Sequence, residues 1–271
     1  MTHASLHVDV HPGDGPPMLM VHGLMAGREL WSANIDALRA VVTPVVVELY
    51  GHGRSPRGLG DDLHRPARYV AEFERIRADL GVERWFVTGQ SLGAGLTVRY
   101  ALDHPDRVLG QVITNSVSAL AERVGTDEGI DAAARHTEDG GIVGLRNHRL
   151  NPARARRIVS PVRDALAADL HLIDPAAVAA AMRFTSHGGS SRGRLHLNTV
   201  PTLLVAGELE EAFVEPTHFA EQHMPMLEVV RVADAGHSPN AEAPDAFNAA
   251  VIGFVRRVLG SSESPPDAMT T

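Results

Sequence analysis

The sequence predicts an α/β fold in which a mostly parallel, doubly wound sheet lies between two layers of helices. Two observations lead to this prediction. Apolar runs of strand length alternate with helix-like stretches along most of the 271-residue chain, and such alternation is typical of parallel strands joined by crossover helices. One strand-to-helix turn also places a serine between two glycines. The length and a hydrophobic content of 44% are sufficient for one large domain.

The first part of the chain predicts a hairpin at the edge of the sheet. Strand 6–10 is followed by the turn Pro12-Gly13-Asp14-Gly15 and by the apolar run 18–21, which has the composition of a buried strand and ends at His22-Gly23. A helix is expected over 29–40. The apolar run 45–49 then predicts a third strand, which ends in the glycine-rich turn Gly51-His52-Gly53-Arg54-Ser55, and a helix is expected over 66–80.

The next strand, 85–89, runs directly into the turn Gly89-Gln90-Ser91-Leu92-Gly93. A serine at a sharp strand-to-helix turn adopts a strained backbone geometry that exposes its hydroxyl, so the residues two before and two after it must lack bulk. Gly89 and Gly93 meet this requirement. Apolar residues at helical spacings follow up to His104-Pro105, which ends the predicted helix. The pattern therefore indicates a nucleophile elbow at Ser91.

The second half of the chain predicts three further strands, separated by a long interruption. The expected strands are 108–114, 202–206 and 228–232, and the expected helices are 217–223 and 244–259. The stretch 115–198 has no strand-like run and contains helical segments such as 175–184, so we interpret it as a helical insertion above the sheet. Residues 1–114 and 199–259 then form the core domain, and the polar tail 260–271 is expected to be disordered.

Charge and composition restrict the classes of function. The net charge of −8 and the pI near 6.0 do not supply the clustered positive surface that nucleic acids require, so we expect a small-molecule substrate instead. The chain has no run of about 18 apolar residues, and its polar start lacks the pattern of a signal peptide. These features predict a cytoplasmic protein without a membrane partner.

Cysteine and lysine are both missing from the sequence. With no cysteine, the chain forms no disulfide, thiolate nucleophile or cysteine-ligated metal site. All 25 cationic residues are arginine, which excludes Schiff-base chemistry on lysine. Oxygen nucleophiles remain, and neither a metal nor another cofactor is expected.

A serine hydroxyl becomes a useful nucleophile when a histidine takes its proton and an acid orients that histidine. His237 lies in a loop of small residues after the last predicted strand, and loops at the carboxyl ends of parallel strands converge where the elbow serine lies. The acid is expected after strand 202–206, where Glu208, Glu210 and Glu211 compete for the role. The order serine, acid, histidine is one of the known triad arrangements.

Acyl transfer also requires donors for the oxyanion that develops in the transition state. We expect one donor to be the backbone N–H of Leu92, next to the nucleophile. The loop His22-Gly23-Leu24, after an earlier strand, is placed to supply the other.

Four motifs, in this order and spacing, resemble the α/β-hydrolase fold superfamily: His22-Gly23, Gly51-His52-Gly53-Arg54-Ser55, Gly89-Gln90-Ser91-Leu92-Gly93 and Gly236-His237-Ser238-Pro239. The resemblance implies an eight-stranded, mostly parallel sheet with 115–198 as a helical cap. It also implies Leu24 and Leu92 as oxyanion donors. Three residues beyond Gly207, where such proteins usually have an aspartate, this chain has Glu210, which is one methylene longer. Glu48 stands at a structural position before the second motif.

The resemblance predicts hydrolysis of a carboxylic ester, lactone or thioester through an acyl-enzyme on Ser91. Similar dehalogenases and epoxide hydrolases have an aspartate at the elbow, so the serine argues against those activities. Two alternatives remain open. The same triad serves as a proton shuttle in carbon–carbon bond hydrolases and lyases, and a non-catalytic relative would bind a ligand without turnover. The sequence does not predict the oligomeric state.

One segment of the insertion carries an arginine run without intervening acidic residues. Two interpretations are open. The run is a solvated helix face in an arginine-rich chain, or it binds an anionic substrate or a phosphopantetheine carrier, since guanidinium groups pair with carboxylates and phosphates. The run consists of Arg146, Arg149, Arg154, Arg156, Arg157 and Arg163.

Overall fold

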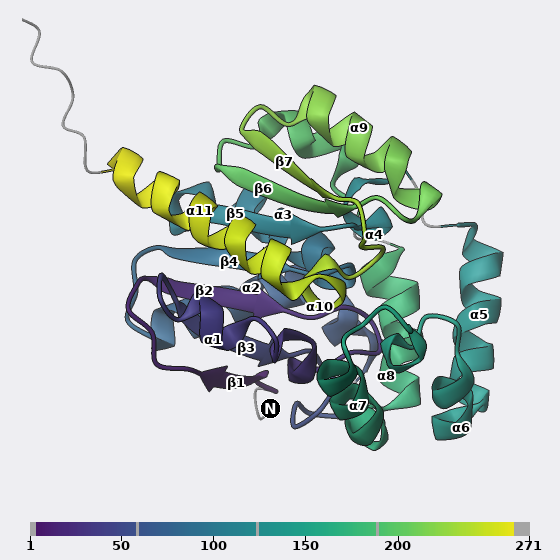
Figure 1. Ribbon diagram of the computed structural model, residues 1–271. Helices are drawn as coiled ribbons and strands as arrows, with labels where there is room; N and C mark the ends of the chain where they lie inside the picture. The colour runs from purple at the N-terminus through teal and green to yellow at the C-terminus, as the bar shows by residue number, and fades with distance from the viewer. Residues whose placement is uncertain (1–3, 58–59, 123–124, 188–189, 263–271) are drawn as a thin grey trace, which may run out of the picture.

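The computed structural model describes residues 4–57, 60–122, 125–187 and 190–262. Its centre is a seven-stranded sheet with the order β1-β3-β2-β4-β5-β6-β7, in which β1 is antiparallel and every other pair is parallel (Figure 1). The predicted fold class is confirmed, although the described residues form seven strands and not eight. The strands are β1 His7–Val10, β2 Pro17–Val21, β3 Thr43–Glu48, β4 Trp85–Gly89, β5 Val108–Thr114, β6 Thr202–Gly207 and β7 Leu227–Val232.

The predicted hairpin between the first two strands is wrong. β1 pairs with β3, with His7 opposite Glu48 and Val10 opposite Val45. Both edges of β2 are already occupied by the parallel neighbours β3 and β4, which leaves β3 as the available edge. The connecting turn needs glycine because its backbone passes close to that of residue 42. A Cβ on Gly13 would lie 2.0 Å from the carbonyl oxygen of Val42.

Helices cover both faces of the sheet because its central strands are apolar on both sides. Leu19 faces α2 and α3 in one cluster with Phe73, whereas Met18 and Met20 face α1 and α11 on the other side (Figure 1). Helix α9 extends the α2–α3 layer. The helices are α1 Ile35–Leu38, α2 Pro66–Asp79, α3 Leu92–Asp103, α4 Val117–Leu120, α5 Asp127–Asp139, α6 Gly141–Asn147, α7 Ser160–Asp169, α8 Pro175–Ala180, α9 Val214–His223, α10 Pro239–Glu242 and α11 Pro244–Ser262.

Residues 115–198, which we call the helical segment, contain α4 to α8 and no strand in their described part. Helices α5 to α8 gather at one end of the sheet (Figure 1). Two apolar clusters hold them there. One joins α5, α6 and α8 to Met25, in the loop after β2. The other joins Val162 of α7 to Leu30, after β2, and to Ala241 of α10. The helical segment therefore packs on the loops that follow the strands.

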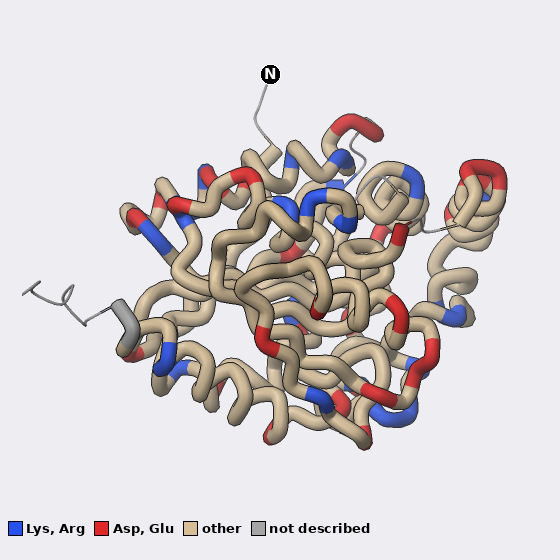
Figure 2. The backbone as a smooth tube through the Cα atoms, turned by 90° about the horizontal axis from the view of Figure 1, so that it is seen from above, with Lys and Arg blue, Asp and Glu red and all other residues tan. Residues whose placement is uncertain are grey.

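The remaining features of the fold concern the end of α11, the length of the helices and the charges on the surface. The disordered tail was predicted to begin at residue 260, but α11 continues to Ser262, and the remaining residues of that prediction, 263–271, lie outside the described part. Within the described residues, no single helix is long and apolar enough to cross a membrane, and one pair bent by 103°, Ser160–Leu172 with Pro175–Ser186, meets that test only together. Acidic and basic residues are interspersed around the outside of the chain (Figure 2).

Candidate active site

Ser91 lies between β4 and α3 with φ 54° and ψ −113°, a strained conformation for a residue with a side chain. The flanking glycines explain how this turn fits. A Cβ on Gly89 would lie 2.4 Å from the carbonyl carbon of Gly93, and a Cβ on Gly93 would lie 2.2 Å from the carbonyl oxygen of Val21. The structure thus places a sharp strand-to-helix turn where the sequence predicts the elbow.

His237 lies in the loop between β7 and α10, and its Nε2 is 2.9 Å from Oγ of Ser91. Burial lowers the pKa of His237 from its ordinary value of 6.5, and the nearby Glu210 and Glu242 carboxylates act in the opposite direction. A neutral imidazole at this distance can accept the hydroxyl proton. Phe213 stacks on the ring with 5.0 Å between centroids and 16° between planes. Nothing in the sequence pattern had pointed to Phe213.

Of the three candidate acids, Glu210 is the one that lies beside the histidine loop. A Cβ on Gly236 would lie 2.9 Å from its Oε1. Glu208 points to Arg231 at 3.6 Å, and Glu211 is exposed. Glu210 does not bond to the histidine, however: within the described part of the chain, Nδ1 of His237 is buried without a hydrogen-bond partner. The Glu210 carboxylate instead lies 3.4 Å from the guanidinium of Arg157.

Glu242 fixes the backbone on both sides of His237, although the sequence analysis did not predict it as a site residue. Its Oε2 accepts a hydrogen bond from the backbone N–H of Gly236 at 2.8 Å, and its Oε1 accepts one from Ser238 at 2.9 Å. The side chain is 3% exposed and pairs with Nε of Arg157 at 3.1 Å. The available signal was a glutamate five residues after the histidine, at the end of a four-residue helix.

Gln90, inside the elbow motif, connects the turn to the histidine loop. Its Nε2 donates to Oγ of Ser238 at 3.0 Å and to the carbonyl oxygen of His237 at 3.4 Å. The amide lies against the loop after β2, where a Cβ on Gly23 would come within 2.1 Å of Oε1 of Gln90 and 3.2 Å of Cβ of Ser91. These contacts bring three predicted motifs together at one point.

Asn115, at the end of β5, is a second connecting residue that the sequence did not reveal. Its Nδ2 donates to the carbonyl oxygens of Gly207 at 2.8 Å and Gly236 at 3.1 Å, and its Oδ1 accepts from the backbone N–H of Gly207 at 3.1 Å. The next residue, Ser116, donates to the carbonyl oxygen of Ser91 at 2.7 Å. The ends of β5 and β6 are thereby fixed relative to both reactive loops.

The two expected oxyanion donors have free backbone N–H groups. Among the described residues, no hydrogen bond is donated by the backbone N–H of Leu24 or Leu92. The residue after Leu24, Met25, has φ 59°, and with Ser91 it is one of two non-glycine residues with positive φ in the described chain. Strain of this kind concentrates at functional sites, and here it lies in both loops that would bind an oxyanion.

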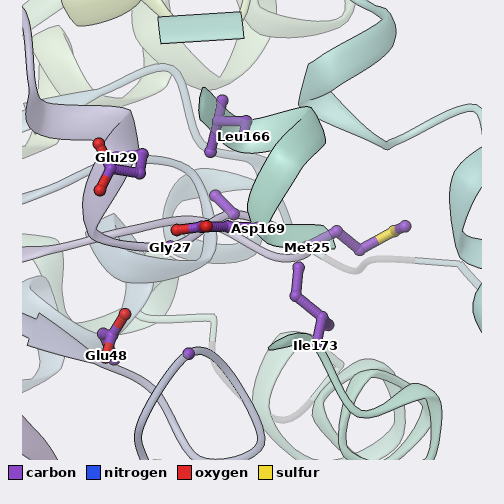
Figure 3. A pocket seen from close by; sticks show the side chains of 9 residues that line it. Met25, Gly27, Glu29, Glu48, Leu166, Asp169 and Ile173 are labelled. Carbon is purple, nitrogen blue, oxygen red and sulfur yellow. The ribbon is translucent and has the colours of Figure 1, made fainter. Parts of the chain in front are cut away.

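A small pocket lies beside the loop after β2 and does not include Ser91 or His237. The carboxylates of Glu29 and Glu48 lie at one side of it, and the side chains of Met25 and Ile173 lie at the other (Figure 3). Glu48 accepts hydrogen bonds from the backbone N–H of Arg54 at 2.9 Å and from its Nε at 3.2 Å. This is the structural role expected for Glu48. No cluster of three potential ligands in the described ranges is arranged to hold a metal ion.

The arginine run divides between the surface and the site. Arg157 is also half exposed, but its guanidinium reaches Glu210 and Glu242. Arg163 lies 3.7 Å from the neighbouring Asp164. The other four members are exposed: Arg146, Arg149, Arg154 and Arg156.

A family model described as alpha/beta hydrolase fold matches residues 16–244. The chain is 28% identical over 257 residues to the dihydrolipoyllysine-residue acetyltransferase component of the acetoin cleaving system of Cupriavidus necator, with 88% of this chain and 63% of that protein covered. It therefore spans less than two thirds of that relative. The chain belongs to the α/β-hydrolase fold family of enzymes.

Two further matches extend over almost their whole lengths. The pimeloyl-(acyl-carrier protein) methyl ester esterase of Nitrosomonas europaea is 25% identical over 258 residues, with 90% of this chain and 97% of that protein covered. The solved structure of MenH from S. aureus has a TM-score of 0.80 at 18% identity, with 96% of this chain and 100% of that chain covered. At this identity the second match concerns the fold alone.

Proposed function

We propose that this protein hydrolyses a carboxylic ester, lactone or thioester through an acyl-enzyme on Ser91. The observation that carries the proposal is the distance of 2.9 Å between Oγ of Ser91 and Nε2 of His237, at a serine held with φ 54°. A strained serine that faces a neutral imidazole is the arrangement that nucleophilic acyl transfer requires. The full-length similarity to a methyl ester esterase supports the same class of substrate.

In this mechanism His237 takes the hydroxyl proton as Oγ of Ser91 attacks the acyl carbon. The carbonyl oxygen becomes an oxyanion, which the backbone N–H groups of Leu24 and Leu92 stabilise. His237 then gives the proton to the departing alkoxide or thiolate, and the acyl group remains on Ser91. A water molecule, deprotonated by His237, releases the acid and regenerates the serine. Glu210, the candidate acid beside the histidine loop, would orient His237 after its carboxylate leaves Arg157. The helical segment acts as the cap over the site.

The first test uses a fluorophosphonate probe and p-nitrophenyl acetate. We expect the probe to modify Ser91, as mapped by mass spectrometry, and to abolish turnover. Ser91→Ala should fold normally, because only a hydroxyl is removed. It should lower kcat by about 10³-fold or more, because that hydroxyl is the nucleophile. Ser32→Ala is the control, since this serine is exposed and its hydroxyl donates to the carbonyl oxygen of Glu29. It should still be labelled at Ser91.

Two outcomes would contradict the proposal. Modification of another serine would show that Ser91 is not the nucleophile. Absence of turnover with esters, lactones and thioesters, together with an enolate absorbance on an enolisable dicarbonyl substrate, would favour the carbon–carbon bond chemistry left open by the sequence. Absence of turnover with every class would favour a binding protein.

A further inference from the structure

The imidazole of His237 has one nitrogen in use and one without a partner. Nε2 faces Oγ of Ser91 at 2.9 Å. For Nε2 to accept the hydroxyl proton, the ring proton must be on Nδ1. That nitrogen is buried and has no hydrogen-bond partner among the residues that the structure describes. A buried N–H donor without an acceptor is unfavourable, so a carboxylate within reach has a strong reason to bind it.

The Glu210 carboxylate lies near enough to His237 to raise its pKa, but it is bound elsewhere. Its Oε1 accepts from the terminal guanidinium nitrogen of Arg157 at 3.4 Å. A Cβ on Gly236 would lie 2.9 Å from both of these atoms, so the ion pair passes directly over the residue before His237. The Glu210 side chain is 37% exposed, which leaves it room to turn.

Arg157 is itself held between two carboxylates. Its Nε donates to Oε2 of Glu242 at 3.1 Å, and Glu242 is 3% exposed and already bound to the backbone on both sides of His237. The buried Glu242 is therefore the fixed partner of Arg157, and the more exposed Glu210 is the partner that can leave.

The position of Arg157 depends on the helical segment. Two residues later, the backbone N–H of Val159 donates to the carbonyl oxygen of Ala241 at 3.0 Å. Ile158 is buried in the cluster that joins α7 to Ala241. Docking of this segment on α10 thus brings the guanidinium to Glu210.

We infer that Arg157 is a positioning residue that holds Glu210 away from Nδ1 of His237, so that the docking of the helical segment controls when the histidine acquires its acid. The inference rests on the proposed function of Ser91 and His237. Glu210 has two alternative partners, Arg157 and Nδ1–H of His237. Release of Arg157 lets Glu210 accept the Nδ1 proton as a hydrogen bond. The charged groups that face His237 and this pair are Glu210, Glu242 and Arg157.

The test compares Arg157→Gln with Arg156→Gln, a matched control at an exposed neighbour that takes part in no ion pair among the described residues. The first readout is the low-field proton resonance of a histidine Nδ1–H bound to a carboxylate. We expect this resonance to be weak or absent in the native protein and in Arg156→Gln, and to appear in Arg157→Gln. In the double variant Arg157→Gln with Glu210→Gln it should disappear.

The second readout is the pH dependence of kcat/KM with a neutral ester. In Arg157→Gln the acidic limb should move to higher pH by about one unit, since a bound carboxylate favours the charged imidazolium. The plateau of kcat/KM should rise about threefold or more, because a larger fraction of the enzyme has its acid in place. Part of the pH shift would follow from loss of a positive charge alone, so the double variant separates the two effects: it should lose the gain in kcat/KM.

Arg157→Lys guards against a folding failure. A lysine keeps the charge, but it presents a single ammonium group where the guanidinium bridges two carboxylates, so it should give an intermediate proton signal in a folded protein. A strong low-field proton in the native protein would overturn the inference, as would its absence in both Arg157→Gln and Arg157→Lys. Fluorophosphonate labelling of Ser91 is measured separately. If labelling fails, the proposed function fails, whereas the proton comparison still decides whether Arg157 controls Glu210.

Discussion

At the scale of single residues, the site depends on two side chains in unusual surroundings. Ser91 has a backbone conformation that most residues avoid, and His237 has a partly buried ring with one nitrogen at 2.9 Å from the serine oxygen. Burial disfavours the imidazolium, so the histidine stays neutral over a wider pH range than a free one. A neutral ring is what a general base requires.

The lowered pKa of His237 predicts the pH profile of the native enzyme. The rate should fall as the pH falls through the pKa of the histidine, since protonated imidazole cannot accept the serine proton. Because burial lowers that pKa, the midpoint of the acidic limb should lie below the ordinary value of 6.5. The measurement is kcat/KM against pH with p-nitrophenyl acetate. A midpoint above 6.5 would mean that the carboxylates outweigh burial, and a flat profile would mean that proton transfer to His237 does not limit the rate.

At the scale of secondary-structure elements, the distance between a helix and its neighbouring backbone determines which residues the helix can contain. The strand β4 turns into α3 so sharply that the first turn of the helix touches the end of β2, and Gly93 has no room for a methyl group beside the carbonyl oxygen of Val21. Helix α11 on the opposite face has no such contact. Apart from the backbone of its own helix, the one atom of the described residues within 4 Å of a Cβ on Gly253 is Nη1 of Arg257, at the flexible end of that side chain and 3.4 Å away.

Alanine substitutions at these two helical glycines should therefore change the free energy of unfolding in opposite directions. Gly93→Ala should lower the free energy of unfolding by about 2 kcal/mol or more, because strand backbone must shift to admit the methyl group. It should also lower kcat, since the elbow moves. Gly253→Ala should raise the free energy of unfolding by about 0.5 to 1 kcal/mol through the lower backbone entropy cost of alanine. Urea unfolding of both variants measures the difference. A neutral Gly93→Ala would show that the elbow is looser than its geometry indicates.

At the scale of the whole molecule, the site exists because distant segments are fixed to one another. Asn115 bonds to Gly207, which is 92 residues away, and to Gly236, which is 121 residues away. Gln90 bonds to Ser238 over 148 residues. The helical segment packs on the loop after β2 and on α10. A disturbance at any of these contacts is expected to reach Ser91 and His237.

Asn115→Ala tests this dependence. The change leaves the backbone N–H of Gly207 without its acceptor and two carbonyl oxygens with one donor fewer, all buried, so we expect a loss of about 3 kcal/mol or more in the free energy of unfolding. We also expect a lower kcat at temperatures where the variant stays folded. Asn147→Ala, at an exposed asparagine, should stay within about 0.5 kcal/mol of the native protein. If both variants behaved alike, Asn115 would not be the link between β5, β6 and the histidine loop.

The features that arise from local chemistry could be predicted from the amino-acid sequence. The elbow at Ser91 follows from two glycines that flank a serine between a strand and a helix, and the alternating apolar runs follow from the periodicity of strands and helices. His237 could be selected because its loop follows the last strand, and parallel strands bring such loops together. Glu210 was predicted by position, and the structure places it beside the histidine loop.

The features that depend on contacts between distant residues could not be predicted from the sequence and are seen in the folded chain. β1 pairs with β3 because β2 already has two neighbours, which no local pattern reveals. Asn115 became part of the site through bonds to atoms far along the chain, and Arg157 and Glu242 did so by pairing with each other across 85 residues. The physical reason is the same in each case: local sequence sets backbone conformation within a few residues, whereas the partner of a polar side chain is set by which segments the fold brings together.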